Sequence, residues 1–151
     1  MDLGTVLLLV ATFGTGAVTG LFLGFSVAVM PGLRATDDAV FLSAMRRINV
    51  AIVNPVFLLV FLGSPLLLLV AALVGPRNAW LWAALALHLA GFAVTPAVNV
   101  PLNNALDAAT DPGPARAAFE RPWNRAHAVR TVLMAASFAA CLVASVELSA
   151  A

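Results

Sequence analysis

The chain has 151 residues, of which 62% are hydrophobic and only 10% are charged, and its mean hydropathy is +1.01. Soluble domains carry about a quarter charged residues, so this composition excludes an ordinary water-soluble domain and a disordered chain. The net charge is +1 and all eight basic residues are arginines, which leaves no polybasic field for nucleic acid. A single cysteine, Cys141, excludes an internal disulfide, and the length predicts one domain over residues 1–151.

The charges are separated by long apolar runs. Four runs carry no charge: residues 3–33, 48–76, 78–106 and 131–146. A helix crosses the hydrocarbon layer of about 30 Å with about 20 apolar residues, and backbone groups in lipid must bond within their own helix. We therefore expect an all-α, multi-pass integral membrane bundle with four spanning helices, near residues 4–29, 50–74, 79–100 and 128–147.

The arginines predict the orientation of this bundle. Loops 30–47 and 105–130 hold seven of the eight arginines, whereas the turn at 75–79 holds only Arg77. Arginine-rich loops stay on the cytoplasmic side, so both loops should be cytoplasmic and both termini outside, in a plasma (inner) membrane. The first apolar run lacks a basic leader and is too long for a signal peptide, so we expect it to be retained.

Small residues recur on the first span. Gly16, Gly20 and Gly24 are spaced by four residues, which puts them on one helix face. Such a face lets helix backbones approach closely in lipid. We expect it to serve packing within the bundle or the seam of a homodimer.

The third span carries an unusual polar face. His88, Thr95 and Asn99 share this face at offsets of 7 and 11, and Asn103 lies close to it. Pro96 and Pro101 should kink or end the helix near Asn99 and free backbone carbonyls there. Polar groups at membrane depth need partners or a wet cavity. For His88 alone, the simpler interpretation is a hydrogen bond to a neighbouring helix.

Two further helix ends should bring polar groups to the level of Asn99 and Asn103. Asn49 opens the second span, and His127 and Arg130 share a face of the fourth span with Trp123. We therefore predict a polar pocket in the cytoplasmic half of the bundle. The alternative is a solvated interface in which arginines contact lipid phosphates.

Several segments around these residues share a pattern: Asn99–Leu106, Phe119–Glu120, Trp123–Thr131, Met30–Leu33, Arg47–Asn49 and Asn54–Phe57. In these segments the chain resembles the anthrone oxygenase-like family, a group of small four-span membrane proteins mostly of unknown function. The resemblance implies a membrane four-helix bundle. It also implies an oxidoreductase that uses dioxygen to oxidise a lipophilic anthrone-, phenol- or quinone-like molecule, without an established flavin or haem cofactor.

That chemistry gives the polar residues expected roles. An anthrone enolate needs a base, for which His127 is the candidate, and donors that hold its oxygen, for which we expect Arg130, Asn99 and Asn103. The remaining expected substrate contacts are Trp123, Asn49, Asn104 and His88. The cofactor is unknown, and the alternative of a transition metal would use His127 with Glu120.

Two other functions remain open at this stage. The protein could be a small-molecule carrier or binding protein without catalysis, or a bundle with a structural role. A proton-coupled carrier would need a carboxylate near the centre of the bundle, and we expect the carboxylates of this sequence to lie at its periphery. The expected partners are the lipid bilayer and a lipophilic small molecule.

Overall fold

The computed structural model describes residues 3–150, apart from the side chain of Ala150, and the regular structure within them is helical. Asp2 lies outside the described residues. The elements are α1 (Leu3–Gly24), η1 (Phe25–Val29), α2 (Met30–Arg34), α3 (Asp38–Ile52), α4 (Pro55–Val74), α5 (Ala79–Val94), η2 (Thr95–Asn99), α6 (Val100–Ala108) and α7 (Pro112–Ala150). Here η marks a π turn, in which each N–H bonds five residues back.

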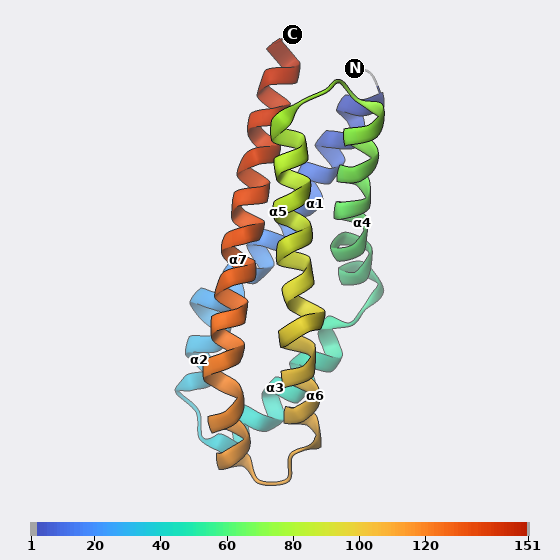
Figure 1. Ribbon diagram of the computed structural model, residues 1–151. Helices are drawn as coiled ribbons and strands as arrows, with labels where there is room; N and C mark the ends of the chain where they lie inside the picture. Colours follow the sequence, from blue (N-terminus) through green and yellow to red (C-terminus); the bar gives the residue numbers. More distant parts are fainter. Residues whose placement is uncertain (1–2, 151) are drawn as a thin grey trace.

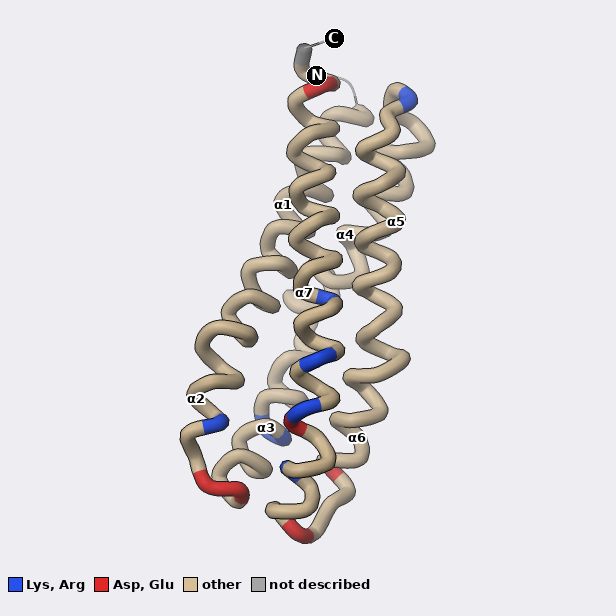
Figure 2. The backbone as a smooth tube through the Cα atoms, turned by 60° about the vertical axis from the view of Figure 1, so that its left-hand side comes forward, with Lys and Arg blue, Asp and Glu red and all other residues tan. Residues whose placement is uncertain are grey.

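These elements form a bundle with four helical stretches long and apolar enough to cross a membrane, which confirms the all-α fold. The stretches are Leu3–Arg34, Pro55–Val74, Ala79–Ala108 and Pro112–Ser149. α1 begins and α7 ends at the same end of the bundle, beside the turn between α4 and α5 (Figure 1). Most charged residues gather at the other end, around α2, α3, α6 and the first turns of α7 (Figure 2). The side of the membrane on which this end lies remains a prediction.

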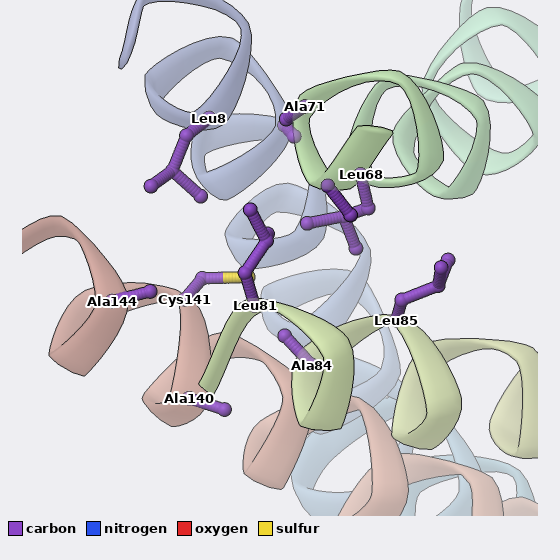
Figure 3. Packing of buried hydrophobic residues seen from close by; sticks show 11 residues of the cluster. Leu8, Leu68, Ala71, Leu81, Ala84, Leu85, Ala140, Cys141 and Ala144 are labelled. Atoms are coloured by element: carbon purple, nitrogen blue, oxygen red, sulfur yellow. The ribbon is translucent and has the colours of Figure 1, made fainter. Parts of the chain in front are cut away.

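The half of the bundle away from these charges is filled by small and branched apolar side chains. Figure 3 shows Leu8 and Leu68 facing Leu81 and Cys141, with Ala84 beside them. A Cβ added at Gly14 would collide with Ser64 of α4, and one at Gly16 would come within 2.9 Å of Phe138 of α7. Glycine thus lets α1 lie close to both neighbours.

The three glycines expected on one face of α1 have different surroundings in the structure. Gly16 packs inside the bundle, whereas a Cβ added at Gly20 or Gly24 would meet no atom of the described residues within 4 Å. Of the three glycines expected on this face, only Gly16 therefore serves packing within the bundle. A homodimer seam remains a prediction.

The second span begins later than expected. The sequence predicts a helix from residue 50, but α3 ends at Ile52 and α4 begins at Pro55. The residue before a proline avoids the helical conformation, and Asn54 is extended. Its side chain accepts from the backbone N–H of Phe57 at 3.0 Å and donates to the carbonyl of Ala51 at 2.9 Å. The apolar residues before this break belong to α3 instead.

Two π turns interrupt the first and third spans. The N–H of Met30 bonds to the carbonyl of Phe25, and that of Val100 bonds to Thr95. A proline follows each turn, at Pro31 and Pro101. A proline ring clashes with the carbonyl four residues back in an α-helix, and a wider turn relieves that clash. The third span therefore kinks but continues past its expected end at residue 100, through α6.

The fourth span belongs to a much longer helix. α7 has 39 residues, or about 58 Å at about 1.5 Å per residue. Residues 115–127 belong to the same helix as the fourth span, and Pro122 lies inside it. Because hydrocarbon accounts for only about 30 Å, part of α7 must extend beyond it, and the expected span puts that part before residue 128.

Candidate functional site

A cavity of about 250 Å³ lies where α1, α3, α4, η2 and α7 meet. Aromatic rings form much of its wall: Phe22, Phe25, Phe57, Phe61 and Trp123. The rings of Phe57 and Phe61 stack with centroids 5.0 Å apart. Flat aromatic walls of this kind suit a planar ring system.

The mouth of the cavity is apolar. Val53 is 65% exposed, Leu62 51% and Val100 41%, and all three line the cavity. Leu62 and Val100 belong to candidate membrane spans. We therefore expect the opening between α4 and the start of α6 to face lipid rather than water.

The polar side chains in the cavity come from separate helix ends, as expected. Asn49 of α3, Thr95 and Asn99 of η2, Asn103 of α6 and Arg130 of α7 line the same space. The expected convergence of these groups is thus present. Their roles in binding or catalysis remain predictions.

Arg130 is the buried cation of this cavity, at 8% exposure. Its Nε donates to Nδ1 of His127 at 3.0 Å, and its Nη1 donates to the hydroxyl of Thr95 at 3.0 Å. The guanidinium lies 4.2 Å from the ring centroid of Phe22, a cation–π contact. Within residues 3–150 no carboxylate forms an ion pair with it. A buried charge without a counter-ion is costly, so this site suits an anionic ligand.

His127 fixes the orientation of Arg130 from the side away from the cavity. Its Nε2 lies 2.9 Å from the carbonyl of Phe22, and its ring stacks on Trp123 with centroids 4.8 Å apart. Because arginine Nε can only donate, Nδ1 of His127 accepts and Nε2 carries the proton. The ring is therefore neutral and has one tautomer. Both nitrogens are engaged, and Arg130 lies between His127 and the cavity.

Asn99 presents an unsatisfied acceptor. Its side chain is 1% exposed, and its Nδ2 reaches the carbonyl of Trp123 at 3.5 Å. Its Oδ1 has no hydrogen-bond partner among the described residues. Asn103 accepts from the indole N–H of Trp123 at 2.9 Å. Since buried acceptors are almost always paired, a ligand with a donor would complete the site at Asn99.

Two expected site residues lie elsewhere. His88 is fully buried with Nδ1 3.4 Å from the hydroxyl of Thr15, and its Nε2 has no partner within the described chain. Asn104 is exposed on α6 and does not line the cavity. Neither is placed to contact a ligand in this cavity, because His88 faces α1 deeper in the bundle and Asn104 faces outward.

The alternative metal pair is not assembled. Glu120 accepts from Nε of Arg34 at 3.1 Å and from Nε of Arg116 at 2.9 Å. Both ring nitrogens of His127 are already engaged, one with the carbonyl of Phe22 and one with Arg130. Among residues 3–150 no group of three His, Cys, Asp or Glu side chains is placed to hold a metal ion. The donor set present here fits an organic anion better than a metal.

Sequence reasoning missed the aromatic wall. The predicted pocket rested on polar residues, and no role was predicted for the phenylalanines of the spans. A signal was present: Phe22 with Phe25, and Phe57 with Phe61, recur at spacings that share a helix face.

Comparison with known proteins supports the resemblance found in the sequence. The model of a family described as anthrone oxygenase matches residues 41–140. This range includes the polar residues of the cavity and the partner of Arg130, His127. No curated protein and no solved structure matches the chain significantly.

Proposed function

Because the chain belongs to the anthrone oxygenase family, we propose that it is a membrane-embedded oxygenase acting on a flat, lipophilic anthrone-, phenol- or quinone-like molecule. The observation that carries this proposal is a cavity with aromatic walls around Arg130, a buried cation without a carboxylate partner. Such a cavity accepts a planar ring system and favours it as an anion.

The reaction proposed is the oxidation of a ring methylene to a carbonyl. The methylene loses a proton, and the resulting enolate carbon gives its electron pair to dioxygen to form a hydroperoxide. Loss of water from the hydroperoxide leaves the carbonyl. One dioxygen is consumed, one of its oxygen atoms stays in the product and the other leaves as water.

Arg130 has the role of binding the enolate oxygen. Its guanidinium lines the cavity, and Thr95 and His127 fix it from two sides. An enolate oxygen would supply the counter-charge for the guanidinium of Arg130. A cationic donor in an apolar site stabilises developing negative charge more strongly than water does.

His127 has the role of the base, coupled to Arg130. Its Nδ1 accepts a proton once the Nε–H of Arg130 turns from it toward the substrate oxygen. The proton taken from the methylene then lies on Nδ1 and returns to the peroxide oxygen. The bond from Nε2 to the carbonyl of Phe22 keeps the ring in place during both steps.

Asn99 has the role of reading a hydroxyl group of the substrate. Its buried Oδ1 accepts from a phenolic O–H placed beside the carbonyl that Arg130 binds. Asn49 and Asn103 line the same space and add donors. Trp123 contributes apolar indole surface to the wall, although its ring already stacks on Phe119 and His127.

Oxygen uptake tests the proposal. The purified protein in lipid nanodiscs is given unsubstituted anthrone or 1,8-dihydroxyanthrone, and consumption of dioxygen is followed beside the anthraquinone formed. We expect uptake above the autoxidation rate, lost in Arg130→Met and kept in Asn104→Ala, whose side chain is exposed outside the cavity. Uptake no faster than autoxidation would contradict the oxygenase. Binding of the anthrones without uptake would favour a carrier or binding protein instead.

The orientation is also proposed from the arginine count. The charged end would lie in the cytoplasm and both termini outside, in the plasma membrane. Ser43 and Ser149 are exposed at opposite ends of the bundle. A membrane-impermeant maleimide added outside sealed cells should therefore label Ser149→Cys and leave Ser43→Cys unlabelled.

A further inference from the structure

A second hollow lies at the charged end of the bundle, outside the cavity described above. It has a volume of about 680 Å³ and lies between α7 and the segment that joins α2 to α3. Its charged lining consists of Arg34, Arg116, Arg121 and Arg125 with Asp38 and Glu120. Four guanidinium groups against two carboxylates leave an excess of two positive charges.

The two carboxylates are already occupied. Glu120 accepts from Arg34 and Arg116, and Nη1 of Arg116 lies 3.0 Å from Oδ1 of Asp38. The excess positive charge therefore belongs to Arg121 and Arg125. Within the described chain neither of these two forms an ion pair.

Arg121 and Arg125 are exposed neighbours on the same face of α7, one turn apart. Like charges at this spacing repel and destabilise a helix unless an anion lies between them. The side chain of Asn124, which also lines the hollow, adds an amide donor beside them. Arginine forks of this kind match the oxygen atoms of a phosphate group.

The same face of α7 becomes apolar immediately beyond the arginines. Val129 and Val132 lie four and seven residues after Arg125, and they are 52% and 67% exposed. Ala128, at the edge of the hollow, is where the apolar run of the fourth span is expected to begin. One helix face thus passes from paired cations to exposed valines at the depth where lipid headgroups meet acyl chains.

We propose that Arg121, Arg125 and Asn124 form a binding site for a phosphate group. Its phosphate is that of an anionic phospholipid whose acyl chain lies along Val129 and Val132. Free phosphate has the same head chemistry but no use for the valines. The site is separate from the aromatic cavity, so it holds whether or not the proposed oxygenase activity is found.

Thermal stability of the delipidated protein in detergent provides the test. Phosphatidylglycerol, phosphatidylcholine and inorganic phosphate are titrated separately, since a ligand that binds the folded state raises the unfolding midpoint. The variants are Arg121→Gln/Arg125→Gln, Val129→Ser/Val132→Ser and the control Arg47→Gln. Arg47 is exposed at the same end of the bundle but does not line the hollow.

We expect phosphatidylglycerol to stabilise the wild type more than phosphatidylcholine does. The double arginine variant should need about tenfold or more phosphatidylglycerol for the same shift, because both cationic contacts to the phosphate are removed, while Arg47→Gln should match the wild type. The valine variant should lose the response to phosphatidylglycerol but keep any response to inorganic phosphate. If inorganic phosphate stabilises the wild type as much as phosphatidylglycerol does, and the valine variant keeps its response to phosphatidylglycerol, the site belongs to free phosphate and not to a phospholipid. Equal losses in the double arginine variant and in Arg47→Gln, or no stabilisation by any of the three compounds, would overturn the proposal.

Discussion

The Nε atom of Arg130 donates to Nδ1 of His127 across 3.0 Å, from three residues further along the same helix. This hydrogen bond joins the buried cation of the cavity to the imidazole ring proposed as the base for the substrate. Neither group is free to act alone: His127 accepts a proton only when Arg130 moves, and Arg130 is held in the cavity by His127. This coupling separates two roles for His127 that mutagenesis can distinguish.

Replacement of His127 by glutamine keeps the hydrogen bonds but removes the base. A glutamine amide has a donor for the carbonyl of Phe22 and an acceptor for Nε of Arg130. We expect His127→Gln to fold like the wild type and to lose about 100-fold or more in turnover, the usual contribution of a general base. Oxygen uptake and circular dichroism provide the measurements. If the glutamine variant keeps most of its turnover while His127→Ala loses it, His127 positions Arg130 and is not the base.

Replacement of Arg130 by methionine removes the buried cation at similar volume. We expect turnover to fall by about 100- to 1,000-fold, as on loss of an oxyanion donor. Stability should stay unchanged or rise, because the structure pairs this charge with no described carboxylate. Thermal unfolding beside oxygen uptake checks both parts. A large loss of stability with unchanged turnover would assign Arg130 a structural role.

Replacement of Asn99 by leucine tests whether its unpartnered oxygen reads a hydroxyl group. The change removes an unsatisfied acceptor, so the unliganded protein should be about as stable as the wild type. The KM for 1,8-dihydroxyanthrone should rise about 10- to 100-fold, while that for unsubstituted anthrone should change little. Equal effects on both compounds would show that Asn99 does not recognise the hydroxyl.

Replacement of Asn54 by alanine should loosen the junction between α3 and α4. The asparagine side chain caps α4 through the N–H of Phe57 and holds the carbonyls of Ala51 and Ile52. Loss of such a cap costs about 1 kcal/mol. Unfolding in mixed detergent should reveal this loss, whereas Asn104→Ala, an exposed asparagine in a helix interior, should not show it. An unchanged midpoint for Asn54→Ala would mean that Pro55 alone fixes the break.

The ion pairs around Glu120 should make stability depend on pH. Burial raises the pKa of this carboxyl, but hydrogen bonds from Arg116 and Arg34 outweigh burial and leave the pKa below its usual value. A carboxyl with a lowered folded-state pKa stabilises the fold above its unfolded pKa and loses this effect as the pH falls through the folded value. The unfolding midpoint of the wild type should therefore drop in acid more than that of Glu120→Gln. Parallel pH curves for the two proteins would contradict this.

The spans followed from the sequence because charge is almost absent where lipid surrounds the chain. Their boundaries were harder to predict. The apolar residues before Asn54 fit a span as well as they fit α3, and only the cap and Pro55 decide between them. The π turns were not predicted, although Pro31 and Pro101 stand after them. A proline shows that a helix must adjust but not whether it will end, kink or widen.

For the candidate site, helix periodicity brought Arg130, His127 and Trp123 onto one face of α7, and the structure keeps them in contact. It also placed His88 with Asn99, because both fit one face of a regular helix. Thr95 and Asn99 of this face line the cavity, whereas His88 lies about 16 Å of helix rise away from Asn99 and contacts Thr15 of α1 instead. The outward position of Asn104 has the simpler cause that neighbouring residues on a helix point in different directions.

The apolar mouth between Val53, Leu62 and Val100 has a consequence for how the rate should scale. A molecule that arrives through this opening has first partitioned into the bilayer, so its effective concentration is its mole fraction among the lipids rather than its amount in the aqueous phase. Diluting both protein and substrate with additional lipid should then slow turnover even when the total volume stays fixed. Diluting the vesicles with buffer should change it little.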